Sequence, residues 1–408
     1  MAATAAKSRA EPAMAFNADE EATVPAVPGS LIEAAVAVLN TAGGFAKAAL
    51  TERAVEAWRA GSLPLLPDAG KEVPMPPAEP ARPSYVELLP PGKVSNKSRL
   101  AGIHALVHAE SCAIDLSWDI IARFGVRRGA GAGEPAAAAM PPAFFEDWVR
   151  VAAEEADHFR SWHARLEEWG GAYGCIPAHS SLWSSAMETA DSLAARLAII
   201  HCVHEARGLD VYPLARRKLD GAGDKLSVGE PRCYAPTPRA AGAGSHVWSS
   251  LGCSLTRREP SITIPSQSHL FPITTPSPAA LLDRNARMEV DHVGAGVRWL
   301  KRIAETGRDV AGGTGLEQAL PAKWEAAVEA AAAEAVSEAA AADAAATDAC
   351  PAADADAGVA ARARATALFH SITADRFTGR LRPPFNTEWR DLAGMPREWY
   401  EPAERKAE

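Results

Sequence analysis

Four long stretches of the chain carry apolar residues three and four positions apart, which is the pattern of an amphipathic helix. Glycine or proline residues stand near most of their ends, where helices commonly start or stop. Alternating runs of β-branched residues, which would indicate strands, are scarce. The sequence therefore predicts an all-α protein built on a four-helix bundle, with helices at residues 96–124, 142–169, 181–219 and 279–307.

Helical spacing also extends before the bundle. Residues 30–60 predict extra N-terminal helices, whereas residues 1–29 are expected to be disordered. We therefore expect one helical domain over residues 30–320. Residues 367–408 have an ordinary composition again, and their aromatic side chains are expected to pack on the bundle.

Two stretches differ in composition from the rest. Residues 222–278 are rich in Pro, Ser, Gly and Thr and lack periodicity, so they predict a flexible insertion. Such an insertion could be a true loop or a translated intron. Residues 321–366 are dominated by alanine, which favours helix but offers little apolar surface to bury. We expect this second stretch to be an Ala-rich spacer rather than core.

Composition narrows the classes of function. The 408 residues carry a net charge of −9, so a nucleic-acid partner is not expected. No apolar run approaches the roughly 20 residues that cross a bilayer, so no membrane partner is expected. The N-terminal residues lack a secretory signal and are too acidic for a typical transit peptide. The six cysteines form no CxxC pair. A cytoplasmic protein is expected, with an organellar location left open.

Only two of the eleven histidines follow a glutamate by three positions. These pairs are Glu155 with His158 in "EADH" and Glu289 with His292 in "EVDH". A spacing of three places both members on one helix face. Both pairs fall within the apolar stripes of their helices, so we expect all four side chains to face the core.

The other two helices each place one acid in an apolar stripe, Glu110 and Glu205. Burying a lone carboxylate is costly unless it is paired or bound to a metal. Beside the first pair, Glu154 and Asp157 fall mostly outside the stripe and are expected on the outer side. The four stripes, each with a buried carboxylate, call for a common explanation.

A dinuclear metal site would provide one, because two divalent cations neutralise four carboxylates. One Glu from each of two helices, with Glu-x-x-His from each of the other two, is typical of ferritin-like carboxylate bundles. Carboxylate and imidazole ligands suit iron or manganese, and zinc stays open. The alternative is a metal-free helical scaffold in which the same groups form salt bridges. The predicted metal ligands are Glu110, Glu155, His158, Glu205, Glu289 and His292.

Several neighbouring residues can be interpreted in two ways. His108 either supports the metal site or satisfies a structural contact. Asp157 and Asp291 precede the ligand histidines and are either orienting partners or exposed charges. Pro213 predicts a bend or π-bulge after Glu205, which Arg207 or Asp210 could hold.

The chain resembles a ferritin-like family known as domain of unknown function 455. The resemblance lies in "HALVHAESCAIDLSWDIIARFG", "FFEDWVRVAAEEADHF", "ARLAIIHCVHEARGLDVYPLARRKL", "DHVGAGVRW" and "RPPFNTEWRDLAGM". It covers residues 30–221, 279–320 and 367–395, and it implies a di-metal carboxylate bundle with the six ligands given above. The stretches 222–278 and 326–366 depart from the family pattern, as do the serines of "PAHSSLW".

The resemblance and the ligand set together favour a non-haem di-iron oxidoreductase that activates O2, of the hydroxylase or oxygenase type. Its cofactors would be two iron ions, with manganese or a mixed iron–manganese pair as alternatives. Its substrate would be an unknown small molecule or modified nucleoside, and a reductase would donate electrons. Ferroxidase activity, or the handling of iron or peroxide, is the alternative function.

Overall fold

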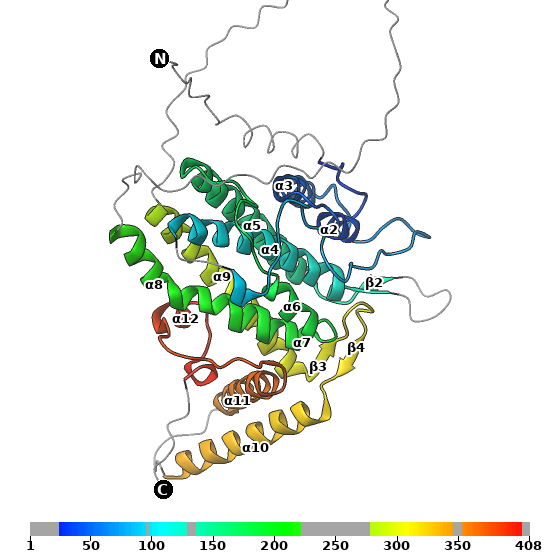
Figure 1. Cartoon of the computed structure of the whole chain (residues 1–408). Coiled ribbons are helices and arrows are strands. Elements are labelled where there is room, and N and C mark those ends of the chain that lie inside the picture. The colour runs from blue at the N-terminus through cyan, green and yellow to red at the C-terminus, as the bar shows by residue number, and fades with distance from the viewer. Residues whose placement is uncertain (1–23, 95–97, 129–135, 222–277, 346–352, 402–408) are drawn as a thin grey trace, which may run out of the picture.

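The computed structural model describes residues 24–94, 98–128, 136–221, 278–345 and 353–401. These residues are mostly helical, as predicted for an all-α protein, and Figure 1 shows their arrangement. The strands form two small antiparallel hairpins, β1 (Val126–Arg127) with β2 (Ala137–Ala138) and β3 (Arg308–Val310) with β4 (Glu317–Ala319). No helix within these ranges is long and apolar enough to cross a membrane.

Two long helices, α4 (Arg99–Phe124) and α5 (Pro142–Glu168), pack along each other. Helix α4 begins where the side chain of Ser98 accepts a hydrogen bond from the amide of Ala101. Helix α5 begins with a proline at its first position, where no amide donor is needed. Both starts agree with the predicted helices to within three residues.

The opposite side of the helical core is formed by α9 (Pro278–Thr306), which packs on α5 and on a long composite helix. The composite helix runs through α7 (Leu193–Arg196), a π-helix η2 (Leu197–His204) and α8 (Glu205–Gly221). Side chains of α4, α5, η2 and α9 meet in one apolar core. Four helical segments therefore enclose the interior that contains the predicted ligands.

The third predicted helix, 181–219, is not continuous. It is divided into α6 (Ser181–Glu188) and the composite helix. The break occurs because Ser192 caps a new helix start and donates a hydrogen bond to Asp309, 2.6 Å away. The π-helical stretch also lies elsewhere than expected, since η2 ends immediately before Glu205 whereas Pro213 lies inside α8.

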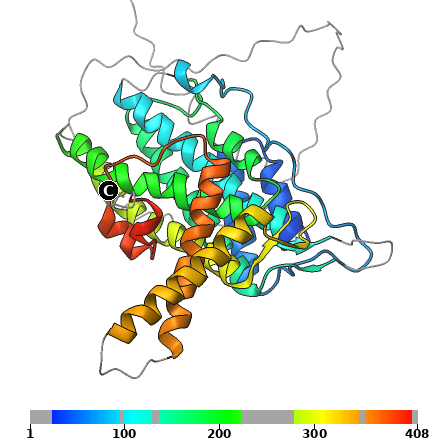
Figure 2. The same cartoon turned by 90° about the horizontal axis from the view of Figure 1, so that it is seen from below.

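The Ala-rich segment is more than the expected spacer. It forms α10 (Ala322–Ala345) and α11 (Ala353–Arg376), which pack against each other as a helical pair (Figure 2). Trp324 and Val328 are buried and supply the apolar anchor that alanine lacks. Helix α11 packs in turn on α9 through its own buried face.

The segments before and after the central helices also pack on them. Residues 24–29 were expected to be disordered, but Val24 and Val27 pack against the core. They lead into α2 (Leu31–Leu39) and α3 (Gly44–Arg59), which cover α4 and α5. At the other end, Trp399 stacks on Phe369 of α11, and a short helix α12 (Thr387–Leu392) contacts α8 and α9. The predicted insertion, 222–278, lies outside the described residues except for its last position.

One glycine sets how closely α9 approaches the π-helix. A Cβ atom at Gly296 would lie 2.6 Å from the Cβ of His201. We expect Gly296→Ala to lower the free energy of unfolding by about 1–3 kcal/mol, the usual cost of overpacking. Gly294→Ala is the matched control, because its Cβ would meet its nearest neighbour at an ordinary 3.5 Å. Thermal unfolding compares the two, and equal stability of both variants would contradict this packing argument.

Candidate metal centre

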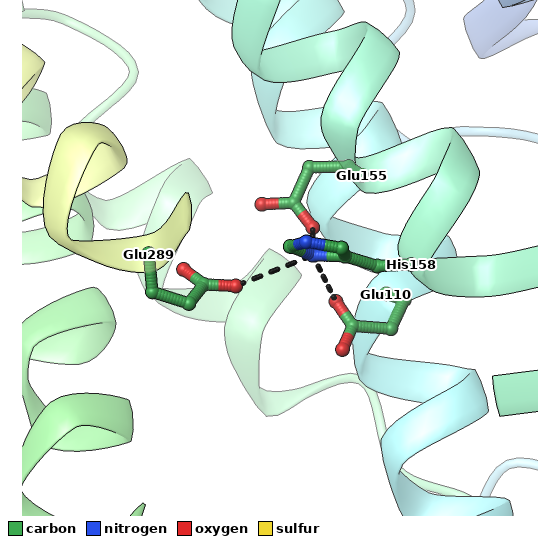
Figure 3. A group of neighbouring side chains, drawn as sticks. All are labelled: Glu110, Glu155, His158 and Glu289. Carbon is green, nitrogen blue, oxygen red and sulfur yellow. Dashed lines mark hydrogen bonds and ion pairs between the residues drawn. The ribbon is translucent and has the colours of Figure 1, made fainter. Parts of the chain in front are cut away.

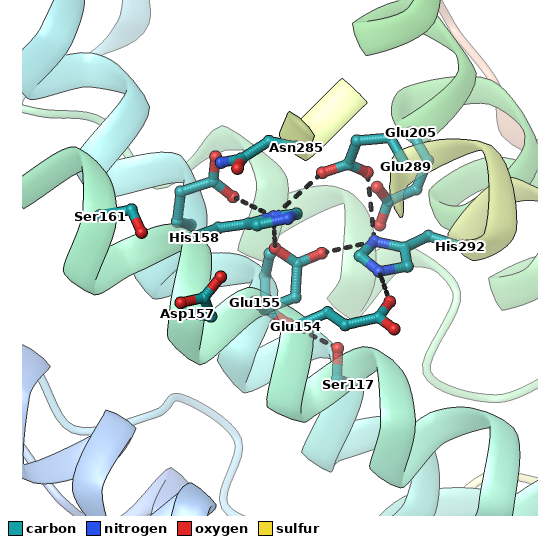
Figure 4. Close-up of polar contacts among 12 residues, drawn as sticks. Ser117, Glu154, Glu155, Asp157, His158, Ser161, Glu205, Asn285, Glu289 and His292 are labelled. Carbon is teal, nitrogen blue, oxygen red and sulfur yellow. Dashed lines mark hydrogen bonds and ion pairs between the residues drawn. The ribbon is translucent and has the colours of Figure 1, made fainter. Parts of the chain in front are cut away.

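All six predicted ligands point into the same part of the helical core (Figures 3 and 4). They form two overlapping groups of four, and within each group the donor atoms lie within 4.8 Å of one another. Glu155 and Glu289 belong to both groups. The first group is Glu110, Glu155, His158 and Glu289, and the second is Glu155, Glu205, Glu289 and His292.

Local helix geometry produces this convergence. On α5, Glu155 and His158 are one turn apart and both are almost fully buried. On α9, Glu289 and His292 repeat the arrangement and face them. Helix α4 contributes Glu110, and Glu205 is the residue at which the π-helix passes into α8, so each of the four helical segments contributes at least one donor.

In the first group, one histidine nitrogen is surrounded by three carboxylates (Figure 3). The Nδ1 atom of His158 lies 3.3 Å from an oxygen of Glu155, 3.5 Å from Glu289 and 3.8 Å from Glu110. A ring nitrogen carries at most one proton, so it cannot donate to all three carboxylates. A cation between the nitrogen and the oxygens would interact with every one of them, which makes the geometry suitable for a metal ion.

The second group repeats the arrangement around the other histidine (Figure 4). The Nδ1 atom of His292 lies 3.0 Å from an oxygen of Glu155 and 3.2 Å from an oxygen of Glu289. Despite these short distances, Nδ1 is buried without a well-aligned hydrogen bond. The nitrogen and the two carboxylates therefore converge on a common point, as the donors to a single cation would. The rings of His158 and His292 have centroids 5.8 Å apart, so the two groups are adjacent.

The carboxylates repel one another in this interior. Burial, opposed by the hydrogen bond from His158 and reinforced by the negative charge of Glu155, raises the pKa of Glu110 to about 8. Burial also raises the pKa of Glu205 well above its ordinary value, with repulsion from Glu289 and Glu155 acting in the same direction. Without a cation, the centre therefore favours protons on these two carboxyl groups.

The two histidines favour their charged form instead. Burial lowers the pKa of His158, but its contacts with Glu110 and Glu155 outweigh burial and raise the pKa well above the ordinary value. The same balance holds for His292, where Glu289 and Glu155 provide the attraction. The raised pKa values of the two histidines reflect an excess of negative charge in this interior. Divalent cations would neutralise that charge.

A residue outside the predicted set completes the second group. The Nε2 atom of His292 donates a hydrogen bond to a carboxylate oxygen of Glu154, 2.7 Å away. Burial raises the pKa of Glu154, but the bond to His292 outweighs it and lowers the pKa. The sequence interpretation placed Glu154 on the outer side of its helix. No pattern within α5 indicated this contact, because it depends on how α5 and α9 pack against each other.

The other candidates lie away from the centre. Asp157 forms a salt bridge with Arg284 at 2.8 Å and is half exposed, and Asp291 is exposed. His108 accepts a hydrogen bond from the Tyr173 hydroxyl and donates one to a backbone carbonyl, so its role is structural.

Arg207 connects α8 to the C-terminal segment. It donates hydrogen bonds to the carbonyls of Arg382 and Pro384, 3.0 and 3.3 Å away, and contacts Asp210. Asp210 in turn is held by the buried guanidinium of Arg390. These contacts fix the C-terminal segment beside α8 rather than holding the π-helix.

The π-helix places a further histidine beside the second group. His201 is buried, and its Nδ1 atom lies 3.6 Å from an oxygen of Glu205. Its ring packs on Trp148 with centroids 4.2 Å apart. Neither ring nitrogen has a hydrogen-bond partner among the described residues. Burial lowers the pKa of His201 well below its ordinary value, so the side chain is a neutral imidazole at the edge of the centre.

Comparison with known proteins agrees with the family resemblance. A family model described as "Protein of unknown function (DUF455)" matches residues 40–229, which include Glu110, Glu155, His158 and Glu205. An "Uncharacterized protein" of Haemophilus influenzae (strain ATCC 51907 / DSM 11121 / KW20 / Rd) is 40% identical over 128 residues. That alignment covers 31% of this chain and 42% of the relative, so it spans less than half of the relative's length. No solved structure matches the chain.

Proposed function

We propose that the chain is a ferritin-like di-iron carboxylate protein that activates O2 to oxidise a substrate. The observation that supports this most strongly is the pair of four-residue groups that share Glu155 and Glu289. Two shared carboxylates and one histidine for each position are the ligand pattern of di-metal sites in helical bundles. A metal-free scaffold would have to bury the same groups as protonated carboxyls and histidine–carboxylate pairs, at the desolvation cost of buried ion pairs.

The packing of the helices supports the ferritin-like assignment. Helices α4 and α5 pack as one pair, and α8 with η2 packs against α9 as the other. Glu110 precedes the pair Glu155 and His158 along the chain, and Glu205 precedes Glu289 and His292, so each helix pair would contribute equivalent ligands. The described contacts thus favour a bundle with internal pseudo-symmetry.

The donor set fits iron, because carboxylates and imidazoles bind iron and manganese in preference to softer metals. Two ferrous ions would supply electrons for the reduction of O2. Glu155 and Glu289 would hold the two positions together, while His158 and His292 would each bind one of them. Buried Trp148, together with other apolar side chains, limits the entry of water, whereas the Glu289 side chain is 20% exposed.

The reaction with O2 tests this function. The chain is loaded anaerobically with Fe(II), mixed with air-saturated buffer, and followed by O2 uptake and iron retention. We expect O2 to be consumed in a single burst while iron stays bound, and further uptake to require an added reductant, because a reductase is the expected electron donor. Continuous Fe(II) oxidation with release or accumulation of iron would contradict an oxygenase and favour iron handling instead.

The substrate of this proposed oxidoreductase would be an unknown small molecule or a modified nucleoside. A matched pair of samples identifies its class. Loaded chain and chain carrying Glu155→Ala are incubated with the same metabolite or nucleoside mixture, O2 and reductant, and the products are compared by mass spectrometry. A product one oxygen atom heavier, or two hydrogen atoms lighter, should form only with the loaded unaltered chain.

A further inference from the structure

The two ligand histidines differ in what the far nitrogen of each ring contacts. In His292, Nε2 donates to Glu154 at 2.7 Å (Figure 4). In His158, Nε2 is buried and has no hydrogen-bond partner within the described part of the chain. Both rings are almost completely inaccessible to solvent, so the difference is not one of exposure.

The sequence explains the asymmetry. Glu154 stands immediately before the ligand Glu155 on α5 and reaches the histidine of α9. The equivalent position on α9, immediately before the ligand Glu289, is Met288. A thioether is only a weak hydrogen-bond acceptor, whereas a carboxylate is a strong one. The two groups therefore have the same spacing between glutamate and histidine. Only the histidine of the second group has a carboxylate behind its ring.

A carboxylate behind a ligand histidine affects metal binding in two ways. It fixes the proton on Nε2, so that Nδ1 presents its lone pair to the metal, and it makes the ring a better donor. Loss of such a partner typically weakens metal affinity by about 10- to 100-fold. The Nδ1 atom of His292 gains both effects, and that of His158 gains neither.

We propose that the two metal positions are inequivalent and fill in sequence, with the position at Glu205 and His292 first and the position at Glu110 and His158 second. Glu154 is the positioning residue that creates the difference. This inference rests on the proposed function, because it assumes that the two groups bind metal ions. It adds that a single equivalent of metal occupies one defined position, which would permit two different metals in one chain.

A titration of the full-length, metal-stripped chain with Mn(II) under anaerobic conditions tests the sequence of filling. Calorimetry should resolve two steps whose dissociation constants differ by about 10- to 100-fold. Electron paramagnetic resonance should report isolated Mn(II) at one equivalent and a coupled pair at two. A crystal grown with one equivalent should show anomalous density beside His292 and little beside His158.

Variants at the supporting acid identify the cause. Glu154→Gln should weaken the first step by about 10- to 100-fold and leave the second unchanged, so the two steps merge. Glu154→Asp should recover part of the difference. Arg150→Ala is the matched control, because Arg150 contacts the same carboxylate oxygen of Glu154, 3.2 Å away, but belongs to neither group of donors. That variant should retain two resolved steps.

The outcomes separate this inference from the function on which it rests. Two equal steps, coupled pairs already dominant at one equivalent, or first density beside His158 would overturn sequential filling while leaving a di-metal protein. Equal weakening of both steps by Glu154→Gln would overturn the role of Glu154. A chain that binds no Mn(II), Fe(II) or Zn(II) would contradict the proposed function itself.

Discussion

Glu155→Ala or Glu289→Ala should abolish binding of both metal ions, whereas Glu110→Ala or Glu205→Ala should remove only one. The reason is that Glu155 and Glu289 belong to both groups of donors, while Glu110 and Glu205 each belong to a single group. Metal content per chain after anaerobic loading and gel filtration, measured by mass spectrometry of the elements, gives the result directly.

Glu146→Gln is the control for these variants, because Glu146 lies on the exposed side of α5 and outside both donor groups. It should bind as much metal as the unaltered chain. Circular dichroism establishes that each variant remains helical, so that lost binding is not lost folding. If Glu155→Ala and Glu289→Ala kept the same metal content as Glu146→Gln, the ligand assignment would be wrong.

Asp119→Ala should lower the free energy of unfolding by about 3–5 kcal/mol, the usual cost of breaking a buried ion pair. Asp119 is fully buried on α4 and accepts hydrogen bonds from Arg123 and from the fully buried Arg196. Removing the carboxylate leaves the guanidinium of Arg196 in the core without its counter-charge. Arg196 ends α7 directly before the π-helix, so this pair also anchors the segment that leads to Glu205.

The pH dependence gives a second measurement of the same contact. Burial raises the pKa of Asp119, but Arg196 and Arg123 outweigh burial and lower it below its ordinary value. A lowered folded-state pKa means that the stabilisation is complete above the unfolded-state pKa of about 3.9 and is lost as the pH falls toward the folded-state value. The difference in stability between the unaltered chain and Asp119→Asn should therefore be full at neutral pH and shrink below about pH 4.

Asp157→Ala is the matched control for Asp119→Ala. Asp157 also pairs with an arginine, Arg284, but both side chains are about half exposed. Such surface pairs contribute about 0–1 kcal/mol. The free energies of unfolding of the two variants, measured with denaturant, should therefore differ by several kcal/mol. Similar losses in both would contradict the buried contribution of Asp119.

The convergence of the six candidate ligands in the core was predictable because helical spacing determines which residues share a face. Glu155 and His158 are three apart in a stripe of apolar residues, and the structure buries both. The same reasoning applied to Glu110 and Glu205, although α4 and α8 also bury Asp119 and Asp210, each of which pairs with an arginine instead. Local periodicity was sufficient, since all six residues lie within helices that the pattern identified.

The features that were not predicted depend on contacts between distant residues. The break before α7 follows from the bond between Ser192 and Asp309, which are 117 positions apart. The bond between Glu154 and His292 spans 138 positions and depends on how α5 and α9 are rotated against each other. Spacing within one helix contains no information about either, so Glu154 was assigned to the outer side.

The helical pair α10–α11 shows a different limit of prediction from sequence. Its alanine-rich composition predicted helix correctly but suggested a spacer, because alanine buries little surface. The packing depends on a few larger residues, including Trp324 on α10 and Leu368 on α11, both almost fully buried. The average composition of a segment therefore does not predict whether it packs on the core when a few large residues make the contacts.

The number of metal ions bound by the full-length chain tests the central claim most directly. The chain is purified without metal, incubated anaerobically with excess Fe(II), freed of unbound iron and analysed for iron and protein. The two donor groups predict close to two iron ions per chain. A chain that stays free of metal with Fe(II), and likewise with Mn(II) and Zn(II), would contradict the account.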